Sequence, residues 1–330
     1  MKLARLAGST PVRDKILAIF PGALGDFICF LPTLDKLTRD GEIDLFTRTE
    51  YGDLLPASVR MRSLECYEIS RLFVSGVEEE EKLKRFFAPY SRVYSWMGSG
   101  QPDFVRNLTL LSNGKLKVFP FRPSVSRIHI TDYFLSCLGA GSSDEITPHI
   151  PIRADALAWS GRLWRQSDLE RKSVLVFSPG SGAREKNWPP DFYAAVAEWW
   201  EKKSAGKSLA VLGPVEEERD KIGGRGDRVL ALRGLELGRV AAVISRCDLY
   251  LGNDSGVTHL AAAVGVKTVA LFGPTDPVQW APRGKRVTVI TRNVECSPCL
   301  SSAMKSCLHH KCLTALSPDY VIGRLEELLG

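Results

Sequence analysis

No apolar stretch of this sequence is long enough to cross a membrane or to act as a secretory leader. The first apolar run, ILAIFPGALGDFICFLP, is broken by Pro21, Gly25 and Asp26. A membrane-spanning helix needs about 20 consecutive, predominantly apolar residues, and a leader needs an unbroken apolar core. The sequence also has no low-complexity tract and no short-period repeat, which argues against a disordered or repeat protein. Cytoplasm is therefore the expected compartment.

The sequence has little excess charge. Its formal net charge is +6 over 330 residues, which is compatible with anionic ligands or an acidic membrane surface. Arginine and lysine do not cluster with aromatic residues, so the sequence does not predict nucleic-acid binding. With 44% hydrophobic and 25% charged residues, the composition is that of a soluble globular protein.

The cysteine content does not indicate a disulfide framework. Eight cysteines are present, and in a cytoplasmic chain of this size they favour free thiols or a metal site. Four of them have the spacing C-x2-C-x7-C-x4-C and could hold zinc or an iron–sulfur cluster; these are Cys296, Cys299, Cys307 and Cys312. Because the second pair lacks the two-residue spacing of a zinc ribbon, free thiols or an occasional disulfide are the alternative.

Strands and helices alternate along the chain, which predicts an open α/β architecture. Apolar runs of the kind buried in parallel sheets predict a first set of strands at residues 16–20, 43–47, 71–74, 93–96 and 116–119, with helices at 79–88, 102–111 and 130–139. A second set of strands is predicted at 174–177, 209–212, 229–232, 249–251, 268–272 and 287–290, with helices at 190–202, 215–222, 236–245, 257–264 and 318–329. A Pro-containing segment and a charged helical stretch separate the two sets, so we expect two domains.

The stretch 248–277 carries the strongest functional signal. It predicts a buried strand, the polar turn GNDSG, a helix and a second buried strand. Strand, glycine-rich turn and helix in this order direct free backbone N–H groups and the positive helix end at one point, which favours a bound phosphate. The alternative is that Asp254 or Ser255 only caps the helix.

Acidic residues follow two other predicted strands. Asp26 lies just past the first strand, where open α/β sheets place their ligand crevice, and it could accept a proton from a substrate hydroxyl. Otherwise it compensates the helix dipole. One of the three glutamates at 216–218 could bind ribose hydroxyls, although dipole compensation explains at least two of them.

The loop SPGSGAREKNWPPDFY, residues 178–193, combines glycine with positive charge. Ser181 and Gly182 could offer backbone N–H groups to a phosphate, and Arg184 and Lys186 add cations to the same loop. Two solvated basic side chains are the alternative interpretation.

Taken together, these motifs resemble those of the family 9 glycosyltransferases, the heptosyltransferases that build the inner core of bacterial lipopolysaccharide. The matching pieces are Leu24-Gly25-Asp26 with the apolar helix after it, the PGSG-to-WP block at 179–189, and the block from NDSGVTHLAAA to VALFGPTDP at 253–277. Their order and spacing cover nearly the whole chain, and the CSPC run from Cys296 also looks like one found in many members.

The resemblance implies a GT-B architecture, in which two Rossmann-like domains face each other across a cleft. Residues 1–153 would form the acceptor-binding domain, 154–172 a linker helix and 173–316 the nucleotide-sugar-binding domain. The C-terminal helix, 317–330, would cross back and pack on the N-terminal domain.

The resemblance also implies an inverting transfer of a heptose or related sugar from a nucleotide sugar, typically ADP-heptose, to a hydroxyl of a lipid-anchored core or similar glycan. Such enzymes need no metal at the reacting centre and would work as peripheral proteins at the cytoplasmic face of the inner membrane. Asp26 matches the general base and Lys186 the cation that stabilises the leaving diphosphate. The loop and helix start that receive the phosphates match Asp254, Ser255, Gly256 and Val257, with His259 on the same helix and Glu217 as a ribose contact.

Two other functions stay open from the sequence. One is a nucleotide-sugar epimerase with the same two-domain cleft, which needs no acceptor. The other is a non-catalytic relative in which the four C-terminal cysteines bind a metal.

Overall fold

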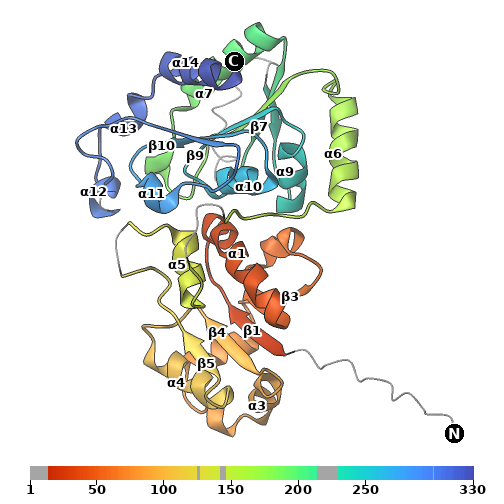
Figure 1. Cartoon of the computed structure of the whole chain (residues 1–330), viewed down its shortest axis with the longest axis vertical. Coiled ribbons are helices and arrows are strands. Elements are labelled where there is room, and N and C mark those ends of the chain that lie inside the picture. The colour runs from red at the N-terminus through yellow and green to blue at the C-terminus, as the bar shows by residue number, and fades with distance from the viewer. Residues whose placement is uncertain (1–13, 125–126, 142–145, 214–228, 300) are drawn as a thin grey trace, which may run out of the picture. The chain divides into compact units, whose positions relative to one another are not determined.

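The computed structural model describes residues 14–124, 127–141, 146–213, 229–299 and 301–330. It contains two parallel sheets flanked by helices (Figure 1). Contacts divide the chain into two compact units, and the larger consists of Gly22–Thr33, Glu50–Pro56 and Arg122–Gly330. Asp26 therefore belongs to the same compact unit as the second sheet. No helix within the described residues is long and apolar enough to span a membrane.

The first sheet has five parallel strands in the order β3-β2-β1-β4-β5. They are β1 (Lys15–Ile19), β2 (Glu42–Thr47), β3 (Val59–Ser63), β4 (Arg92–Ser95) and β5 (Leu116–Val118). The helices from the same part of the chain are α1 (Leu24–Asp40), α2 (Tyr67–Ser70), α3 (Glu81–Phe87), α4 (Pro102–Leu111) and α5 (Ile130–Cys137). The central strand β1 is apolar throughout its buried length, as expected for a strand covered on both faces.

The strand predicted at 71–74 was wrong. Those residues form a 3-10 turn at Arg71–Phe73, in which only Leu72 is buried. The Asn107 amide donates to the carbonyl oxygens of Leu72 and Val74 at 3.0 and 2.7 Å. Backbone groups that a sheet would have paired are thus satisfied by one buried side chain.

The edge strand β3 was not predicted. Its sequence, VRMRS, carries two arginines, and only its first residue is buried. Arg62 Nε donates to Asp44 Oδ2 on the neighbouring strand at 2.9 Å, and the Asp44 side chain is only 5% exposed. A cross-strand ion pair of this kind stabilises an edge strand, but no apolar period reveals it in the sequence.

The second sheet has six parallel strands in the order β11-β10-β9-β6-β7-β8. They are β6 (Val174–Ser178), β7 (Lys207–Val211), β8 (Val229–Leu232), β9 (Leu249–Asn253), β10 (Thr268–Phe272) and β11 (Val287–Thr291). The helices are α6 (Ala154–Gln166), α7 (Pro190–Ser204), α9 (Leu237–Ile244), α10 (Gly256–Val264), α11 (Pro277–Trp280), α12 (Ser301–Lys305), α13 (Lys311–Thr314) and α14 (Pro318–Leu329). The helix predicted at 215–222, which carries Glu217, lies outside the described residues.

An apolar cluster packs against the second sheet and holds the loop after β6 in place. Trp188 is fully buried in it, and its indole Nε1 donates to the carbonyl of Leu316 at 2.7 Å. Burial of a side chain of this size contributes about 1.5–3 kcal/mol or more. The indole therefore anchors the end of the 179–189 loop to the sheet.

The terminal helix α14 packs on α7, and its packing on the N-terminal domain stays a prediction. Val321 and Leu325 are fully buried in the same cluster as Trp200 of α7, and Figure 1 shows the two helices side by side. Trp199 Nε1 also donates to Glu326 Oε1 at 3.3 Å. An amphipathic pattern specifies that one helix face is buried, but it does not specify which surface covers that face.

Candidate active site

The order of strands in the second sheet reverses between β6 and β9. From β6 the chain moves to β7 and β8 on one side, and it returns to β9 and β10 on the other. In open parallel sheets, ligands bind beside the carboxyl ends of the strands at such a switch point. The loop at 179–189 follows β6 and the turn at 253–256 follows β9, so two predicted site segments meet there.

Asn253 ties these two segments together. Its Nδ2 donates to the carbonyl of Pro179 at 2.7 Å. Its Oδ1 accepts from the Trp188 backbone N–H and from the Tyr193 hydroxyl, both at 2.9 Å. The side chain is fully buried. From the sequence, Asn253 is expected only to form part of a turn, because turn asparagines usually bond within their own turn.

The N-terminus of helix α10 has a side-chain cap, but no acidic residue in its first turn compensates its positive end. The Ser255 side chain accepts from the Thr258 N–H at 3.4 Å, and the Thr258 hydroxyl donates to the Asn253 carbonyl at 2.6 Å. The first turn contains no acidic residue. The N–H groups of Gly256 and Val257 belong to that turn, where a helix offers no acceptor. The cap and the predicted anion site are therefore compatible rather than alternatives.

The start of α10 lies against the start of α1. A Cβ placed on Gly256 would lie 2.7 Å from Leu24 Cβ and 3.0 Å from the Gly25 nitrogen. A Cβ on Gly25 would lie 3.3 Å from His259 Cδ2. Only glycine at position 256 permits this approach without movement. Asp26, the next residue after Gly25, is thus held beside the start of α10.

Lys186 is held in an ion pair at the same place. Its Nζ lies 3.0 Å from Asp254 Oδ2, and the Thr275 hydroxyl donates to the same oxygen at 2.8 Å. The side chains of Lys186 and Asp254 are only 21% and 9% exposed, so this pair is less screened than a surface pair. The pair positions the Lys186 ammonium beside the turn that precedes α10.

Asp26 carries a bidentate ion pair with Arg122. The guanidinium donates to Asp26 Oδ1 at 2.7 Å and to Oδ2 at 2.9 Å, and it lies over the Trp280 ring at 4.9 Å from the centroid. The Asp26 side chain is 11% exposed and that of Arg122 is 45% exposed. Arg122 could not be identified from the sequence, because a single arginine in a loop has no pattern that separates it from a solvated one.

His259 is buried beside the same groups. It is 5% exposed, and burial lowers its pKa to about 4, with the carboxylates of Asp254 and Asp26 opposing the shift only in part. The imidazole is therefore neutral at pH 7. Its Nδ1 lies 3.4 Å from Cys29 Sγ.

The other predicted donor-binding residues lie in the loop after β6 or outside the described residues. The Ser181 hydroxyl is used within its own loop, where it bonds the carbonyl of Ala183 and Asn187 Oδ1, both at 2.6 Å. Gly182 is exposed, and a Cβ there would meet no atom within 4 Å. Backbone groups of this loop are thus the ones left for a ligand, while Glu217 is not described.

The four C-terminal cysteines lie around the turn after β10. The Cys299 N–H donates to the Pro274 carbonyl at 2.7 Å, and a Cβ on Gly273 would lie 3.3 Å from Cys312 Sγ. In the part of the chain that the structure describes, no three histidine, cysteine or acidic side chains lie where they could hold a metal together. As they stand, the four thiols do not fit a metal centre.

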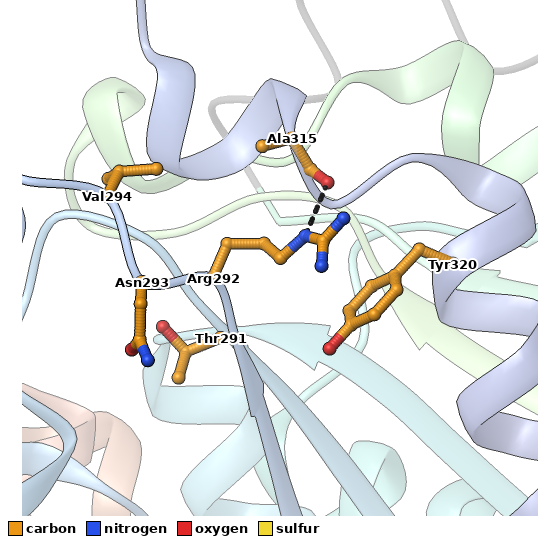
Figure 2. Close-up of a pocket in the computed structure, with 6 residues that line it drawn as sticks. All are labelled: Thr291, Arg292, Asn293, Val294, Ala315 and Tyr320. Atoms are coloured by element: carbon orange, nitrogen blue, oxygen red, sulfur yellow. Dashed lines mark hydrogen bonds between the residues drawn. The ribbon is translucent and has the colours of Figure 1, made fainter.

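A cavity of about 430 Å³ opens at the carboxyl end of β11 (Figure 2). The Arg292 guanidinium crosses it, lying 3.9 Å above the centre of the Tyr320 ring and donating from Nε to the Ala315 carbonyl at 3.1 Å. None of the predicted site residues lines this cavity. It is therefore separate from the site at β6 and β9.

Known protein families and curated proteins include relatives of this chain. The model of glycosyltransferase family 9 (heptosyltransferase) matches residues 144–309. Lipooligosaccharide heptosyltransferase 2 of Campylobacter jejuni is 29% identical over 171 residues, which are 48% of this chain and 51% of the relative. The chain thus spans about half the length of the curated relatives it matches.

Solved structures are similar over nearly the whole chain. The glycosyl transferase family 9 protein from Veillonella parvula has a TM-score of 0.74 at 22% identity, covering 96% of this chain and 98% of that chain. ADP-heptose lps heptosyltransferase II of Escherichia coli has a TM-score of 0.72 at 19% identity, with the same coverage. These similarities confirm the predicted GT-B fold. Because the family model matches half of the chain, including the loop after β6 and the whole β9–α10 segment, this chain belongs to glycosyltransferase family 9, the heptosyltransferases.

Proposed function

We propose that the protein is an inverting glycosyltransferase that moves a heptose, or a related sugar, from ADP-heptose to a hydroxyl of a lipopolysaccharide core or similar lipid-anchored glycan. The proposal is carried by the meeting of Lys186, the start of α10 and Asp26 in one compact unit. Family membership supports the class of reaction. The name of the Escherichia coli enzyme, ADP-heptose lps heptosyltransferase II, supports the donor.

The donor diphosphate would bind at the start of α10. Backbone N–H groups of the first turn and the positive helix end favour an anion there, and the Lys186 ammonium adds a full charge. Asp254 would serve the diphosphate through Lys186, because a carboxylate repels phosphate. The loop at Ser181 and Gly182 would add backbone N–H groups. A ribose contact by Glu217 is proposed from the sequence alone.

The transfer would be a single displacement. The acceptor oxygen forms a bond to the anomeric carbon from the side opposite the diphosphate, the bond from that carbon to the phosphate oxygen breaks, and ADP departs with both bonding electrons. Asp26 takes the proton of the acceptor hydroxyl. Lys186 and the start of α10 stabilise the negative charge that develops on the leaving phosphate.

The ion pair between Arg122 and Asp26 implies that the acceptor does more than supply the hydroxyl. While the Arg122 guanidinium donates to both Asp26 oxygens, the carboxylate is engaged by the cation rather than by an acceptor hydroxyl. We propose that an anionic group on the acceptor draws Arg122 away and frees Asp26. A lipid-anchored acceptor would also bring the protein to the membrane surface as a peripheral protein.

Substitution Asp26→Asn tests the proposal. It should lower the rate of transfer from ADP-heptose by about 10²–10⁴-fold, while ADP still binds with an affinity within about threefold of the parent protein by calorimetry, since Asp26 makes no contact with the leaving group. Asp35→Asn is the matched control, because Asp35 lies on the same helix but is exposed and pairs with Arg39. Transfer at the parent rate in Asp26→Asn would overturn the assignment.

Incubation with ADP-heptose alone separates transfer from epimerisation. A transferase should leave the donor sugar unchanged until an acceptor is added. An epimerised nucleotide sugar formed without acceptor would instead support the alternative function.

We propose that transfer needs no metal at the reacting centre, because Lys186 and the start of α10 supply the positive charge. Zinc or iron bound by the four C-terminal cysteines would then be separate from the chemistry. Elemental analysis of Cys299→Ser and of chelator-treated protein, with transfer measured on the same samples, tests this. Loss of transfer in step with loss of metal would contradict it.

A further inference from the structure

One buried thiol near the site has no role in the proposed chemistry. Cys29 lies on α1, one turn after Asp26, and is 1% exposed. Its Sγ is 3.4 Å from Nδ1 of His259, which is also buried. In such a contact away from solvent, one of the two groups donates and the other accepts.

Both partners are neutral at pH 7. Burial raises the pKa of the Cys29 thiol to about 12 and lowers that of the His259 imidazole to about 4. The starts of α1 and α10 both lie beside the ring, and the positive ends of two helices further disfavour an imidazolium. A neutral imidazole carries its proton on only one nitrogen, and the hydrogen bond at the other nitrogen decides which one.

The buried hydroxyl of Thr131 adjoins the same thiol. It has no nitrogen or oxygen partner among the described residues, and it is close enough to act on the Cys29 sulfur. A buried hydroxyl without another acceptor is satisfied when it donates to that sulfur. The thiol proton is then available to Nδ1 of His259.

The other ring nitrogen lies near the starts of α1 and α10, where the diphosphate is predicted to bind. Nε2 would lie 3.7 Å from a Cβ on Gly25, and Gly25 adjoins Gly256 at the start of α10. With Nδ1 as acceptor, Nε2 carries the proton and can donate to a phosphate oxygen. In the opposite tautomer an Nε2 lone pair would face the phosphate and repel it.

We propose that Cys29 is a positioning residue: its thiol holds His259 in the tautomer that carries the proton on Nε2, so that this N–H donates to the diphosphate of the donor. The inference rests on the proposed function for its ligand. The tautomer itself is a property of the protein alone.

The first measurement is the tautomer, read from the ¹⁵N chemical shifts of the His259 ring in protein without ligand. The parent protein should show the proton on Nε2, and Cys29→Ser should keep it there because a hydroxyl also donates. Cys29→Ala should shift the ring toward a mixture of tautomers. A proton on Nδ1 in the parent protein, or an unchanged ring in Cys29→Ala, would overturn the inference.

The second measurement is ADP binding by calorimetry. Cys29→Ala should raise the dissociation constant about 3–10-fold, the effect of one hydrogen bond of ordinary strength, while Cys29→Ser restores it. In a His259→Gln background Cys29→Ala should have no further effect, because Cys29 acts only through the ring. An equal loss in both backgrounds would mean that the thiol only fills space.

Cys247→Ala is the control for loss of a thiol elsewhere in the protein, since Cys247 is partly buried and also has a raised pKa but lies in the chain just before β9. It should leave both the ring shifts and ADP binding unchanged. If the parent protein does not bind ADP at all, the proposed function fails, and the ring shifts still decide the tautomer.

Discussion

The helices α1 and α10 begin in similar ways but differ in the charge carried by their first turns. Each follows a buried strand and a glycine-containing turn. The first turn of α1 contains Asp26, so that helix supplies an anion for its own positive end. The first turn of α10 contains no acidic residue, and the carboxylate just before it, Asp254, faces Lys186 and Thr275 instead.

The difference indicates how one repeated unit can serve two purposes. A helix that carries its own carboxylate presents a base, whereas a helix left uncompensated presents a place for an anion from outside. The close approach at Gly25 and Gly256 puts the two helix starts side by side. Substitutions at four residues test this difference between the two helix starts.

The largest effect should come from removing the cation that serves α10. Lys186→Met should lower the turnover number for transfer by about 10²–10³-fold, as loss of one electrostatic stabiliser of a transition state does, and should weaken ADP binding. It also leaves Asp254 buried without its partner, so thermal stability should fall. Lys186→Met/Asp254→Asn should regain stability without regaining transfer. Transfer that returns with stability would show that Lys186 acts only through the fold.

His259, packed between the two helix starts, should make stability depend on pH. Its pKa is lowered to about 4 in the folded protein, against about 6.5 when unfolded, so the unfolded state binds the proton first as pH falls. Stability is full above pH 6.5 and is lost toward pH 4, by about 3 kcal/mol for this shift. The neighbours that face the ring, Asp254, His129, Asp26 and Lys186, are present in His259→Gln as well. Urea unfolding at each pH should therefore show a smaller acid loss in that variant, and equal losses would contradict the lowered pKa.

Gly256→Ala should separate the two helix starts. The added methyl would lie 2.7 Å from Leu24 Cβ, and overpacking of this kind costs about 1–3 kcal/mol. Gly323→Ala is the control, because its methyl would meet no atom within 4 Å on α14 and should stabilise that helix by about 0.5–1 kcal/mol. Removing the obstructing Cβ in Gly256→Ala/Leu24→Gly should recover part of the loss in thermal unfolding. No recovery would mean that contact with Leu24 is not what destabilises Gly256→Ala.

The smallest effect should come from the cap of α10. Ser255→Ala should lower the free energy of unfolding by about 1 kcal/mol and Ser255→Gly by only a few tenths, because the side chain accepts from Thr258 N–H. Chemical denaturation of both variants measures the difference. Equal losses would imply that the serine acts by its bulk rather than as a cap.

Much of the second sheet could be predicted from the sequence, because strands buried on both faces consist of continuous apolar runs. The strand at 268–272 and the helix at 102–111 have the predicted bounds. The chain at 71–74 was misread for the same reason: four largely apolar residues are also compatible with a turn whose backbone is satisfied by a side chain from elsewhere. Helix α1 passes through Pro32 without a break.

The site could be predicted only where its groups lie in sequence motifs. Asp26, Lys186 and the turn at 253–256 lie in such motifs, and their roles stay predictions. Arg122, Thr275 and Cys29 could not be found, because each acts on a residue more than 20 positions away in the chain. Contacts of that range depend on how the elements pack, and no local pattern encodes them.

The buried side-chain amide of Asn253 cannot be replaced by a carboxylate without loss of a hydrogen bond. Its donor and its acceptor are both in use, with the donor facing the Pro179 carbonyl. Hydrolysis of this amide to an aspartate would change one atom and bring two oxygens face to face at the same 2.7 Å separation. An aspartate at position 253 should therefore weaken the hold on the loop that carries Lys186 without altering any residue of the proposed chemistry, and lower donor affinity in an Asn253→Asp variant would show it.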